Sequence, residues 1–250
     1  MNSCGALSTG GASFEGNVDG GSTIKSIVTQ DVDSINDKSY SVVLYVQRRR
    51  VGKEFFFTMG DNTVMRGGVV VSIWWDNRIG FNLHSDFTNT DSTFPDDTGV
   101  WVHWAFVYNN IGNGMSIFRD GVSQTPQAAA ASNPDYNGGT SGGPSSATGP
   151  IHLGVNKWDT TNKPFNGNMD EVRVYADRAL TQLEVASRMA NPITDDSSLV
   201  FSMTLDGSGG DLGKDSSCRG VGDATSVTAV SVTGKECGTV DSSAVVSCNR

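Results

Sequence analysis

Six residues of this sequence have the side chains that a sugar-binding site uses. They are Trp74, Asn77, Arg78, Tyr136, Trp158 and Asp159. The first three lie at the tip of an expected hairpin, and the others lie in polar loops. An aromatic face packs against the C–H groups of a sugar ring, while amide, guanidinium and carboxylate groups bond its hydroxyls. The sequence therefore predicts a carbohydrate-binding site here, although each aromatic residue could instead pack beneath a loop.

The elements that must position these residues are short strands. Apolar and β-branched runs alternate with turn residues, which is typical of strands joined by tight connections. Strands are expected at 40–46, 55–59, 69–75, 79–83, 101–108, 115–119, 151–155 and 169–175. One helix is expected near 181–190, where Thr181 and Glu184 form a capping-box pattern. This arrangement predicts an all-β protein, an antiparallel two-sheet β-sandwich.

Strict alternation along the 169–175 strand divides its side chains between two faces. One face would carry Met169, Glu171, Arg173 and Tyr175, and the other Asp170, Val172 and Val174. Neighbouring carboxylates on opposite faces cannot act together on one substrate. Alternation therefore argues against Asp170 and Glu171 as a catalytic pair.

The composition indicates an acidic globular protein. Its 250 residues include 18 Lys and Arg against 27 Asp and Glu, so the formal net charge is −9. An acidic chain without a basic stripe is expected to bind neither nucleic acid nor anionic membranes. The sequence contains no run of eighteen apolar residues, so no membrane-spanning segment is expected. The first residues do not resemble a secretion signal, and Met1 is interpreted as an addition to a mature fragment.

One basic cluster departs from this acidic pattern. Residues 48–53 read Arg-Arg-Arg-Val-Gly-Lys between two strongly apolar strands. Such a cluster is usually a solvated hairpin end that keeps the strands from pairing with other chains. An anion-binding site is the alternative, and the first interpretation is favoured.

Four cysteines occur, at Cys4, Cys218, Cys237 and Cys248. They show no C-x-x-C spacing and have no histidine nearby, which disfavours a zinc site. Two disulfides formed in an oxidising, extracellular compartment are predicted, with three possible connectivities. Free buried thiols are the alternative.

Phe165 and Gly167 precede a Met-Asp-Glu-Val-Arg-Val-Tyr run at 169–175. This motif resembles the closing strand of LamG-like, concanavalin A-like jelly-roll domains, and two further motifs, in the expected order, resemble other strands of that family. The Trp-Val-His-Trp run at 101–104, with the strand ending at Asp120-Gly121, resembles its central hairpin. Cys4–Leu7 and Ser13–Gly16 resemble its opening strand. The resemblance covers roughly residues 4–190 and implies a jelly-roll sandwich.

The resemblance also implies a domain division and a calcium ion. Residues 1–194 would form the LamG-like domain, and 195–250 would complete the sandwich or begin a further tandem repeat. Structural Ca²⁺ would lie between the opening segment and the last strand, with Asp170, Glu15 and Asp19 as ligands at matching positions. Calcium prefers six to eight oxygen ligands. Asp31-Val32-Asp33 has the start of a calcium loop but lacks its Gly and closing Glu.

The nearest enzymes on the architecture that the resemblance implies are jelly-roll glucanases, and it implies their catalytic signature, Glu-x-Asp-x-x-Glu on one strand. The signature is absent from this sequence. We therefore expect no catalytic residues, and a secreted lectin-like or adhesion module that binds a glycan or a glycosylated surface. A structural or protein-binding adhesion module without a sugar site is the main alternative. A glycoside hydrolase with displaced carboxylates is a further one.

Overall fold

The structure is a computed structural model, and it describes several ranges of the chain. They are residues 10–14, 25–60, 68–73, 77–83, 86–89, 96–111, 114–124, 147–157, 163–190, 196–205, 224–227 and 230–233. All four cysteines lie outside these ranges, so the disulfides stay a prediction.

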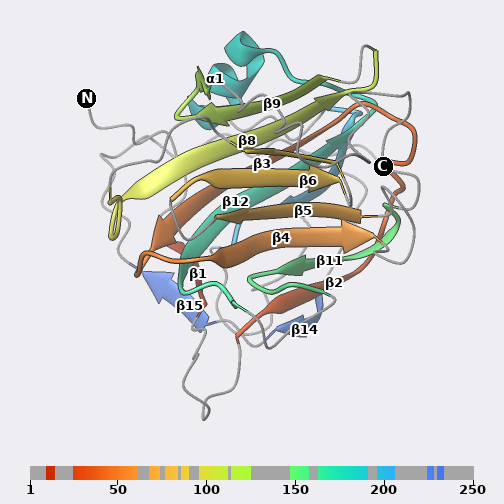
Figure 1. Cartoon of the computed structure of the whole chain (residues 1–250). Helices are drawn as coiled ribbons and strands as arrows, with labels where there is room; N and C mark the ends of the chain where they lie inside the picture. The colour runs from red at the N-terminus through yellow and green to blue at the C-terminus, as the bar shows by residue number, and fades with distance from the viewer. Residues whose placement is uncertain are drawn as a thin grey trace, which may run out of the picture.

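Short strands with tight connections form two antiparallel sheets, as the sequence predicts (Figure 1). The first sheet has the order β10 (Val122–Gln124), β9 (Gly114–Arg119), β8 (Trp101–Asn109), β3 (Tyr40–Arg48), β12 (Gly167–Ala176), β1 (Gly10–Phe14) and β15 (Val230–Thr233), and β13 (Leu199–Met203) also pairs with β12. The second sheet has the order β14 (Ala224–Val227), β2 (Ile27–Val32), β11 (Gly149–Leu153), β4 (Glu54–Gly60), β5 (Gly68–Ile73), β6 (Ile79–Leu83) and β7 (Asp86–Asn89). The predicted hairpin forms, with Ile73 of β5 opposite Ile79 of β6.

Apolar side chains from both sheets fill the space between them. Along β3, Val42, Leu44 and Val46 enter this core, whereas Val43 joins a smaller cluster on the outer face. Among the largest fully buried side chains are the aromatic rings of Phe14, Phe56, Phe81, Phe106 and Phe165. Each such ring stabilises the fold by roughly 1.5–3 kcal/mol relative to an exposed one. Burial between layers therefore holds the two sheets together.

The predicted faces of the 169–175 strand are wrong, because β12 contains a bulge. Asp170 lies opposite Tyr45 and Arg173 lies opposite Val43, so two residues of β12 face one of β3. Glu171, at the bulge, has a left-handed φ of 53°. Alternation is reset there: Met169, Val172 and Val174 all enter the inter-sheet core. Strict alternation therefore does not hold between Asp170 and Glu171, and it gives no reason to exclude them as a pair of carboxylates on one face.

The amino-terminal strand β1 pairs with β12, the strand that resembles the closing strand of the jelly roll. Ala12 pairs with Met169, and Phe14 pairs with Gly167. Three strands beyond residue 194 also join the two sheets: β13 pairs with β12, β14 with β2, and β15 with β1. The domain boundary near residue 194 stays a prediction, because pairing alone does not show that the segments fold as one unit.

The helix α1 (Gln182–Ala190) begins where the capping box predicts. The amide of Glu184 donates to Thr181 Oγ1 at 3.3 Å, and the amide of Thr181 donates to Glu184 Oε2 at 2.8 Å. Val185 and Leu180 anchor the helix in the outer apolar cluster with Tyr175. The cap therefore fixes the residue at which α1 begins.

We expect Thr181→Ala to lower the free energy of unfolding by about 1 kcal/mol, because it removes the acceptor for the first helical amides. Thr181→Ser keeps the hydroxyl and is the matched control. Urea denaturation of the three proteins measures the difference. Equal midpoints for Thr181→Ala and the unaltered chain would contradict the capping role.

Candidate carbohydrate-binding site

The structure describes two of the six predicted sugar-binding residues, Asn77 and Arg78. Trp74, Tyr136, Trp158 and Asp159 lie outside the described residues. Asn77 has a left-handed φ of 60° at the turn between β5 and β6, a conformation that asparagine tolerates well. Both described side chains are partly exposed. Their role in binding sugar stays a prediction.

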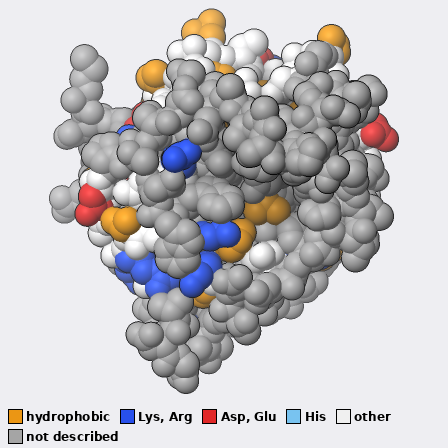
Figure 2. All heavy atoms as spheres, viewed as in Figure 1, with side chains coloured by type: hydrophobic (Ala, Val, Ile, Leu, Met, Phe, Trp, Pro, Cys, Tyr) orange, Lys and Arg blue, Asp and Glu red, His pale blue; other side chains and the backbone are white. Residues whose placement is uncertain are grey.

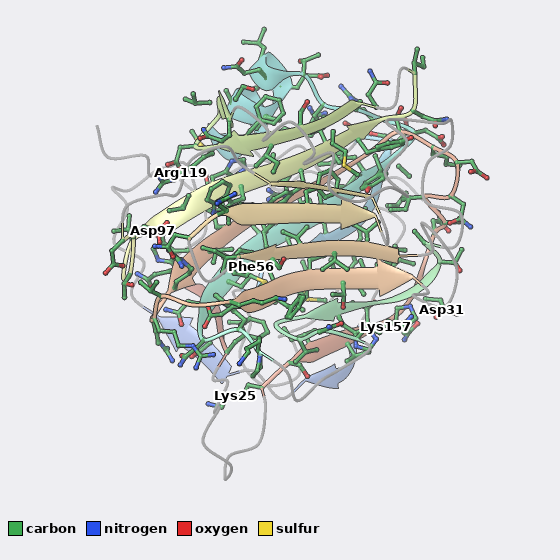
Figure 3. All side chains as sticks on the ribbon, in the orientation of Figure 1. Lys25, Asp31, Phe56, Asp97, Arg119 and Lys157 are labelled. Atoms are coloured by element: carbon green, nitrogen blue, oxygen red, sulfur yellow. The ribbon has the colours of Figure 1, made fainter. Side chains whose placement is uncertain are left out.

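Asn77 lies in a polar cluster at one end of the sandwich. Arg48 Nη1 donates to Asn77 Oδ1 at 3.2 Å, and Arg48 Nε donates to Asp97 Oδ1 at 2.9 Å. Arg119 Nη2 lies 3.4 Å from the second oxygen of Asp97 (Figure 3). Arg48 is 3% exposed and Asp97 is 7% exposed. The buried carboxylate of Asp97, shared by Arg48 and Arg119, connects turns of the two sheets. Asn77 belongs to this cluster through its bond from Arg48, so its side chain contributes to the structure.

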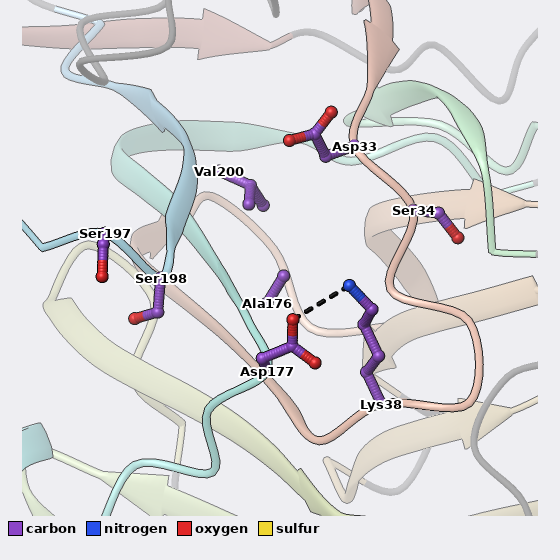
Figure 4. A pocket seen from close by; sticks show the side chains of 8 residues that line it. All are labelled: Asp33, Ser34, Lys38, Ala176, Asp177, Ser197, Ser198 and Val200. Carbon is purple, nitrogen blue, oxygen red and sulfur yellow. Dashed lines mark hydrogen bonds and ion pairs between the residues drawn. The ribbon is translucent and has the colours of Figure 1, made fainter.

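A polar pocket of about 510 Å³ opens at a different place. Its polar lining is Asp33, Ser34, Lys38, Asp177, Ser197 and Ser198 (Figure 4). Ala176 and Val200 supply the apolar part of the lining. The volume falls in the range of roughly 300–1,000 Å³ that small-molecule sites occupy. None of the described lining residues is aromatic.

The pocket and the polar cluster around Asp97 lie at opposite ends of the same strands. Ala176 of the pocket pairs with Tyr40, whereas Arg48 of the cluster pairs with Gly167. Tyr40 and Arg48 are eight positions apart along β3, which corresponds to roughly 26 Å. Figure 3 shows Asp97 on one side of the molecule and Asp31, which precedes the pocket residue Asp33 by two positions, on the other. The structure therefore does not bring Asn77 and Arg78 to the pocket.

One wall of the pocket is held by Asp196, which precedes β13. Asp196 Oδ2 accepts from Arg178 at 2.7 Å and from Arg188 of α1 at 2.5 Å. Its other oxygen accepts from the amide of Ser198 at 3.0 Å. Burial alone would raise the pKa of Asp196, but the hydrogen bonds from Ser198 and Arg188 outweigh it and lower that pKa. An ionised Asp196 therefore fixes the Ser197 and Ser198 wall to the helix.

The opposite wall is the connection between β2 and β3. Ile35 is fully buried and its amide donates to Ala147 O at 3.3 Å. Asn110 Nδ2 donates to the carbonyl of Asp37 at 2.8 Å. These contacts place Asp33 and Lys38 beside the end of β12. Lys38 Nζ then reaches Asp177 Oδ2 at 2.9 Å, and Figure 4 shows the two side chains pointing toward one another.

The lining can bond a polyol from several sides. Asp33 and Asp177 accept from hydroxyl groups, Lys38 donates to them, and the serine hydroxyls can do both. The side chains of Lys38 and Asp177 are 41% and 67% exposed, so their ion pair is weak in water. A ligand can therefore replace this ion pair at small cost. Two carboxylates against one ammonium favour a neutral or cationic ligand over an anion.

These pocket residues were not predicted as a sugar site from the sequence. They come from three segments far apart in the chain, at 33–38, 176–177 and 197–200. Asp33 belongs to the incomplete calcium loop, and Asp177 follows the family-like strand directly. Polar residues at loop positions give no distinct spacing, so only the three-dimensional pairing of β3, β12 and β13 assembles them.

Asp170, the described member of the predicted calcium set, is fully buried on the outer face of the first sheet. Its Oδ1 accepts from the amide of Glu171 at 2.8 Å. Burial lowers the pKa of Arg173, and Tyr175 and then Asp170 oppose that shift. Arg173 also forms an ion pair with Glu171. A guanidinium beside the carboxylate does not fit a cation site at Asp170 alone.

Within the described ranges, no group of three His, Cys, Asp or Glu is placed to hold a metal. The calcium prediction depends on Glu15 and Asp19, outside the described residues, and stays a prediction.

His103 lies in the same buried outer face. It is 1% exposed, and its ring packs against the ring of Tyr45 with centroids 4.8 Å apart. Burial, and secondly the charge of Arg173, lower the pKa of His103 to about 3. Neither ring nitrogen has a hydrogen-bond partner among the residues that the structure describes. A histidine with so low a pKa stays neutral near pH 7, and it is a poor general base.

The two stacked antiparallel sheets with one short helix define a jelly-roll β-sandwich. A laminin G-type family model, described as the concanavalin A-like lectin/glucanases superfamily, matches residues 19–186. The chain belongs to this family. No curated protein sequence matches it.

Two solved structures show the same fold at low sequence identity. One is a protein from Bacteroides ovatus that is provisionally described as carbohydrate-binding, with a TM-score of 0.65 and 16% identity. The match covers 92% of this chain and 61% of that longer one. The other is a heptameric SAP-like pentraxin from Limulus polyphemus, with a TM-score of 0.64 and 12% identity over 93% of this chain and 99% of that one. Identities this low show a shared fold alone.

We expect His103 to make the fold sensitive to acid. Its folded pKa of about 3 lies below the ordinary value of 6.5. Below pH 6.5 the unfolded chain therefore binds a proton that the folded chain does not, and stability falls as the pH falls. Between pH 6.5 and 4.5 this residue alone should remove about 2–3 kcal/mol.

His103→Gln removes this titration. Urea midpoints at pH 7.0, 5.5 and 4.5 should fall less steeply for the variant than for the unaltered chain. Other groups titrate equally in both proteins, so the difference reports His103. Parallel pH curves would contradict a buried, neutral histidine.

Proposed function

We propose that the chain is a non-catalytic, extracellular, lectin-like module that binds a neutral or amino sugar of a glycan in the pocket between Asp33 and Asp177. The pocket itself carries this proposal, since it has the size of a small-ligand site and a lining of carboxylates, hydroxyls and one ammonium. Membership of a family named for lectins and glucanases supports the same function.

The pocket chemistry favours recognition by hydrogen bonds. Charged groups bond sugar hydroxyls more strongly than neutral groups do, at roughly 1.5–3 kcal/mol each. Asp177, at the end of β12, has a left-handed φ of 58°, which turns the chain into the pocket wall.

Binding without catalysis is supported by the missing Glu-x-Asp-x-x-Glu signature. A glycoside hydrolase needs a carboxylic acid and a carboxylate on opposite sides of the scissile bond. Lys38 bonds Asp177 directly, so this carboxylate already serves as an acceptor of a hydrogen bond. Release of reducing sugar from chromogenic polysaccharides would overturn this part of the proposal.

An extracellular location is supported by the family and by the cysteine pattern. Within the described residues, no helix is long and apolar enough to cross a membrane.

A protein-binding adhesion module is the second candidate. Val122 of β10 and Leu183 of α1 are 58% and 81% exposed, and β10 and α1 are in contact. Exposed apolar side chains on neighbouring elements favour contact with a protein surface. A glycan array on which nothing is retained, with or without calcium, would favour this candidate over the lectin.

We expect Asp33→Asn and Asp177→Asn each to weaken binding of the best glycan on such an array by roughly 10- to 100-fold, because each loses a charge-assisted hydrogen bond. Asp37→Asn is the matched control, since it makes the same charge change on the loop that holds Asp33 but does not line the pocket. Calorimetry measures the three affinities. Equal losses in all three variants would contradict binding in the pocket.

We also propose that structural calcium stabilises the fold through Glu15, Asp19 and Asp170. A ligand that binds only the folded chain at 100 times its Kd raises stability by about 2.7 kcal/mol. The melting temperature should therefore rise with added Ca²⁺ and fall in chelator, and Mg²⁺ should have a smaller effect. A melting temperature unchanged by millimolar Ca²⁺ would remove the calcium site and leave the pocket untouched.

A further inference from the structure

Lys38 places a positively charged amine in the pocket to which the proposed function assigns a sugar. Lys38 and Asp177 both line this pocket, and Lys38 Nζ lies 2.9 Å from Asp177 Oδ2. Figure 4 shows this contact among the lining side chains. Lys38 supplies the only ammonium group among the described residues of the lining. Asp177 therefore already binds an ammonium at the place where a ligand would lie.

The backbone on both sides of Lys38 is held by Asn110. Asn110 Nδ2 donates to the carbonyl of Asp37 at 2.8 Å, and the amide of Asn110 donates to Ser39 Oγ at 3.0 Å. The side chain of Lys38, by contrast, is 41% exposed, and its ammonium is carried on a flexible four-carbon stem. Lys38 can therefore leave Asp177 by rotation of its side chain, without a change in the loop that carries it.

The backbone on both sides of Asp177 is held in a similar way. The amide of Ala176 donates to the carbonyl of Ser198 at 2.7 Å, and the amide of Arg178 donates to the carbonyl of Ser39 at 3.1 Å. The side chain of Asp177 is 67% exposed and so can be reached from solvent. An ammonium that replaced Lys38 would therefore meet the carboxylate at the same wall of the pocket.

Two serines of the lining offer complementary hydrogen-bonding groups. Ser34 Oγ accepts from the amide of Asn36 at 3.1 Å, so its hydroxyl hydrogen can donate to a ligand. Ser198 Oγ donates to Asp196 Oδ1 at 2.6 Å, so its lone pairs can accept from a ligand. The lining thus suits an ammonium that is accompanied by hydroxyl groups, which is the pattern of an amino sugar.

Exchange of one ammonium for another conserves the charged contact at Asp177. A ligand hydroxyl in the place of Lys38 would substitute a neutral donor for a charged one, and hydrogen bonds between charged groups are the stronger kind. A ligand ammonium would restore the charged contact, while the partly exposed Lys38 would return to water. A free amine is therefore favoured over a hydroxyl or an acetylated amine at this position.

The arginines that hold the neighbouring wall are paired with carboxylates. Arg178 pairs with Asp196 and Glu184. Arg188 pairs with Asp196 as well. Figure 2 shows Lys and Arg side chains gathered at the lower left of the face in view, in the region where β4 begins in Figure 1. That region lies at the far end of β3 from the pocket. Among the described lining residues, Lys38 is therefore the cation with which a ligand amine must compete.

We infer that the glycan bound in the pocket carries a free, unacetylated amino group, and that this amine displaces Lys38 from Asp177. This ligand class rests on the proposed function, since it concerns the same pocket. Lys38 acts as an internal competitor, which keeps the carboxylate paired until a ligand amine takes its place. A polyamine offers the same charge but none of the hydroxyl groups that Ser34 and Ser198 can bond, so an amino sugar is favoured over it.

The test compares a glucosamine tetramer with an N-acetylglucosamine tetramer, each titrated into the full chain by calorimetry in mildly acidic buffer at physiological ionic strength. We expect the glucosamine tetramer to bind roughly threefold to tenfold more tightly. Asp177→Asn should abolish this preference, because the amide that replaces the carboxylate carries no charge. Equal affinities of the two tetramers for the unaltered chain, or tighter binding of the acetylated one, would overturn the amine assignment.

Lys38→Gln gives the sharper test, because a gain in affinity is expected rather than a loss. Removal of the internal competitor should tighten binding of the glucosamine tetramer roughly twofold to fivefold, without the same gain for the acetylated tetramer. Lys53→Gln is the matched control: it makes the same charge change at the far end of β3, where salt screens its effect on the pocket. An unchanged or weaker affinity of Lys38→Gln for the glucosamine tetramer would contradict competition by Lys38.

Cellotetraose and spermidine separate this inference from the proposed function. If cellotetraose binds, loses affinity in Asp33→Asn and is bound as tightly as the glucosamine tetramer, the pocket remains a sugar site and only the amine assignment fails. If no tetramer loses affinity in Asp33→Asn or Asp177→Asn, the pocket and the amine assignment fail together. Spermidine binding as tight as that of the glucosamine tetramer would overturn the amino sugar, because the pocket would then recognise charge alone.

Discussion

The bulge at Glu171 determines which side chains of the central strand enter the core. β12 pairs with β1, β3 and β13, so its side chains set the register of much of the first sheet. One extra residue moves Val172 and Val174 to the same side as Met169. Without it, Arg173 would point into an apolar core, where an unpaired charge costs several kcal/mol. The left-handed conformation of Glu171 is the local cost of that arrangement.

The two ends of β12 are each fixed by contacts with distant segments. At Gly167, β12 begins beside Arg48 of β3, and the 163–166 segment that leads into it carries the acceptors for Arg49 and Arg50. A Cβ added at Gly167 would lie 2.3 Å from the carbonyl of Gln47, so only glycine allows this approach. At Ala176, β12 ends beside Tyr40, and the next residue, Asp177, lines the pocket. One strand therefore positions the pocket at one end and the 48–53 connection at the other.

Much of the fold can be predicted from local sequence because its strands are apolar and its turns are polar. The β5–β6 hairpin and the Thr181 cap form as predicted, since each depends on residues only a few positions apart. The faces of β12 cannot be predicted this way. A bulge leaves no distinct residue type at Glu171, and only the pairing of Asp170 with Tyr45 and of Arg173 with Val43 reveals it. The predicted roles of Asn77 and Arg78 concern recognition, which the fold alone does not test.

The pocket shows why long-range assembly is hard to predict from a sequence. Asp33, Asp177 and Ser198 are separated by more than a hundred residues in one case and by about twenty in the other. Each belongs to a segment whose polar residues alone suggest an ordinary loop. Asp196 then couples the Ser198 wall to α1 through Arg188, so the helix stabilises a site that it does not line. The chain has an acidic surplus, but the described residues place no group of three His, Cys, Asp or Glu to hold a cation. Which polar side chains meet at each end of the sandwich thus depends on strand pairing more than on composition.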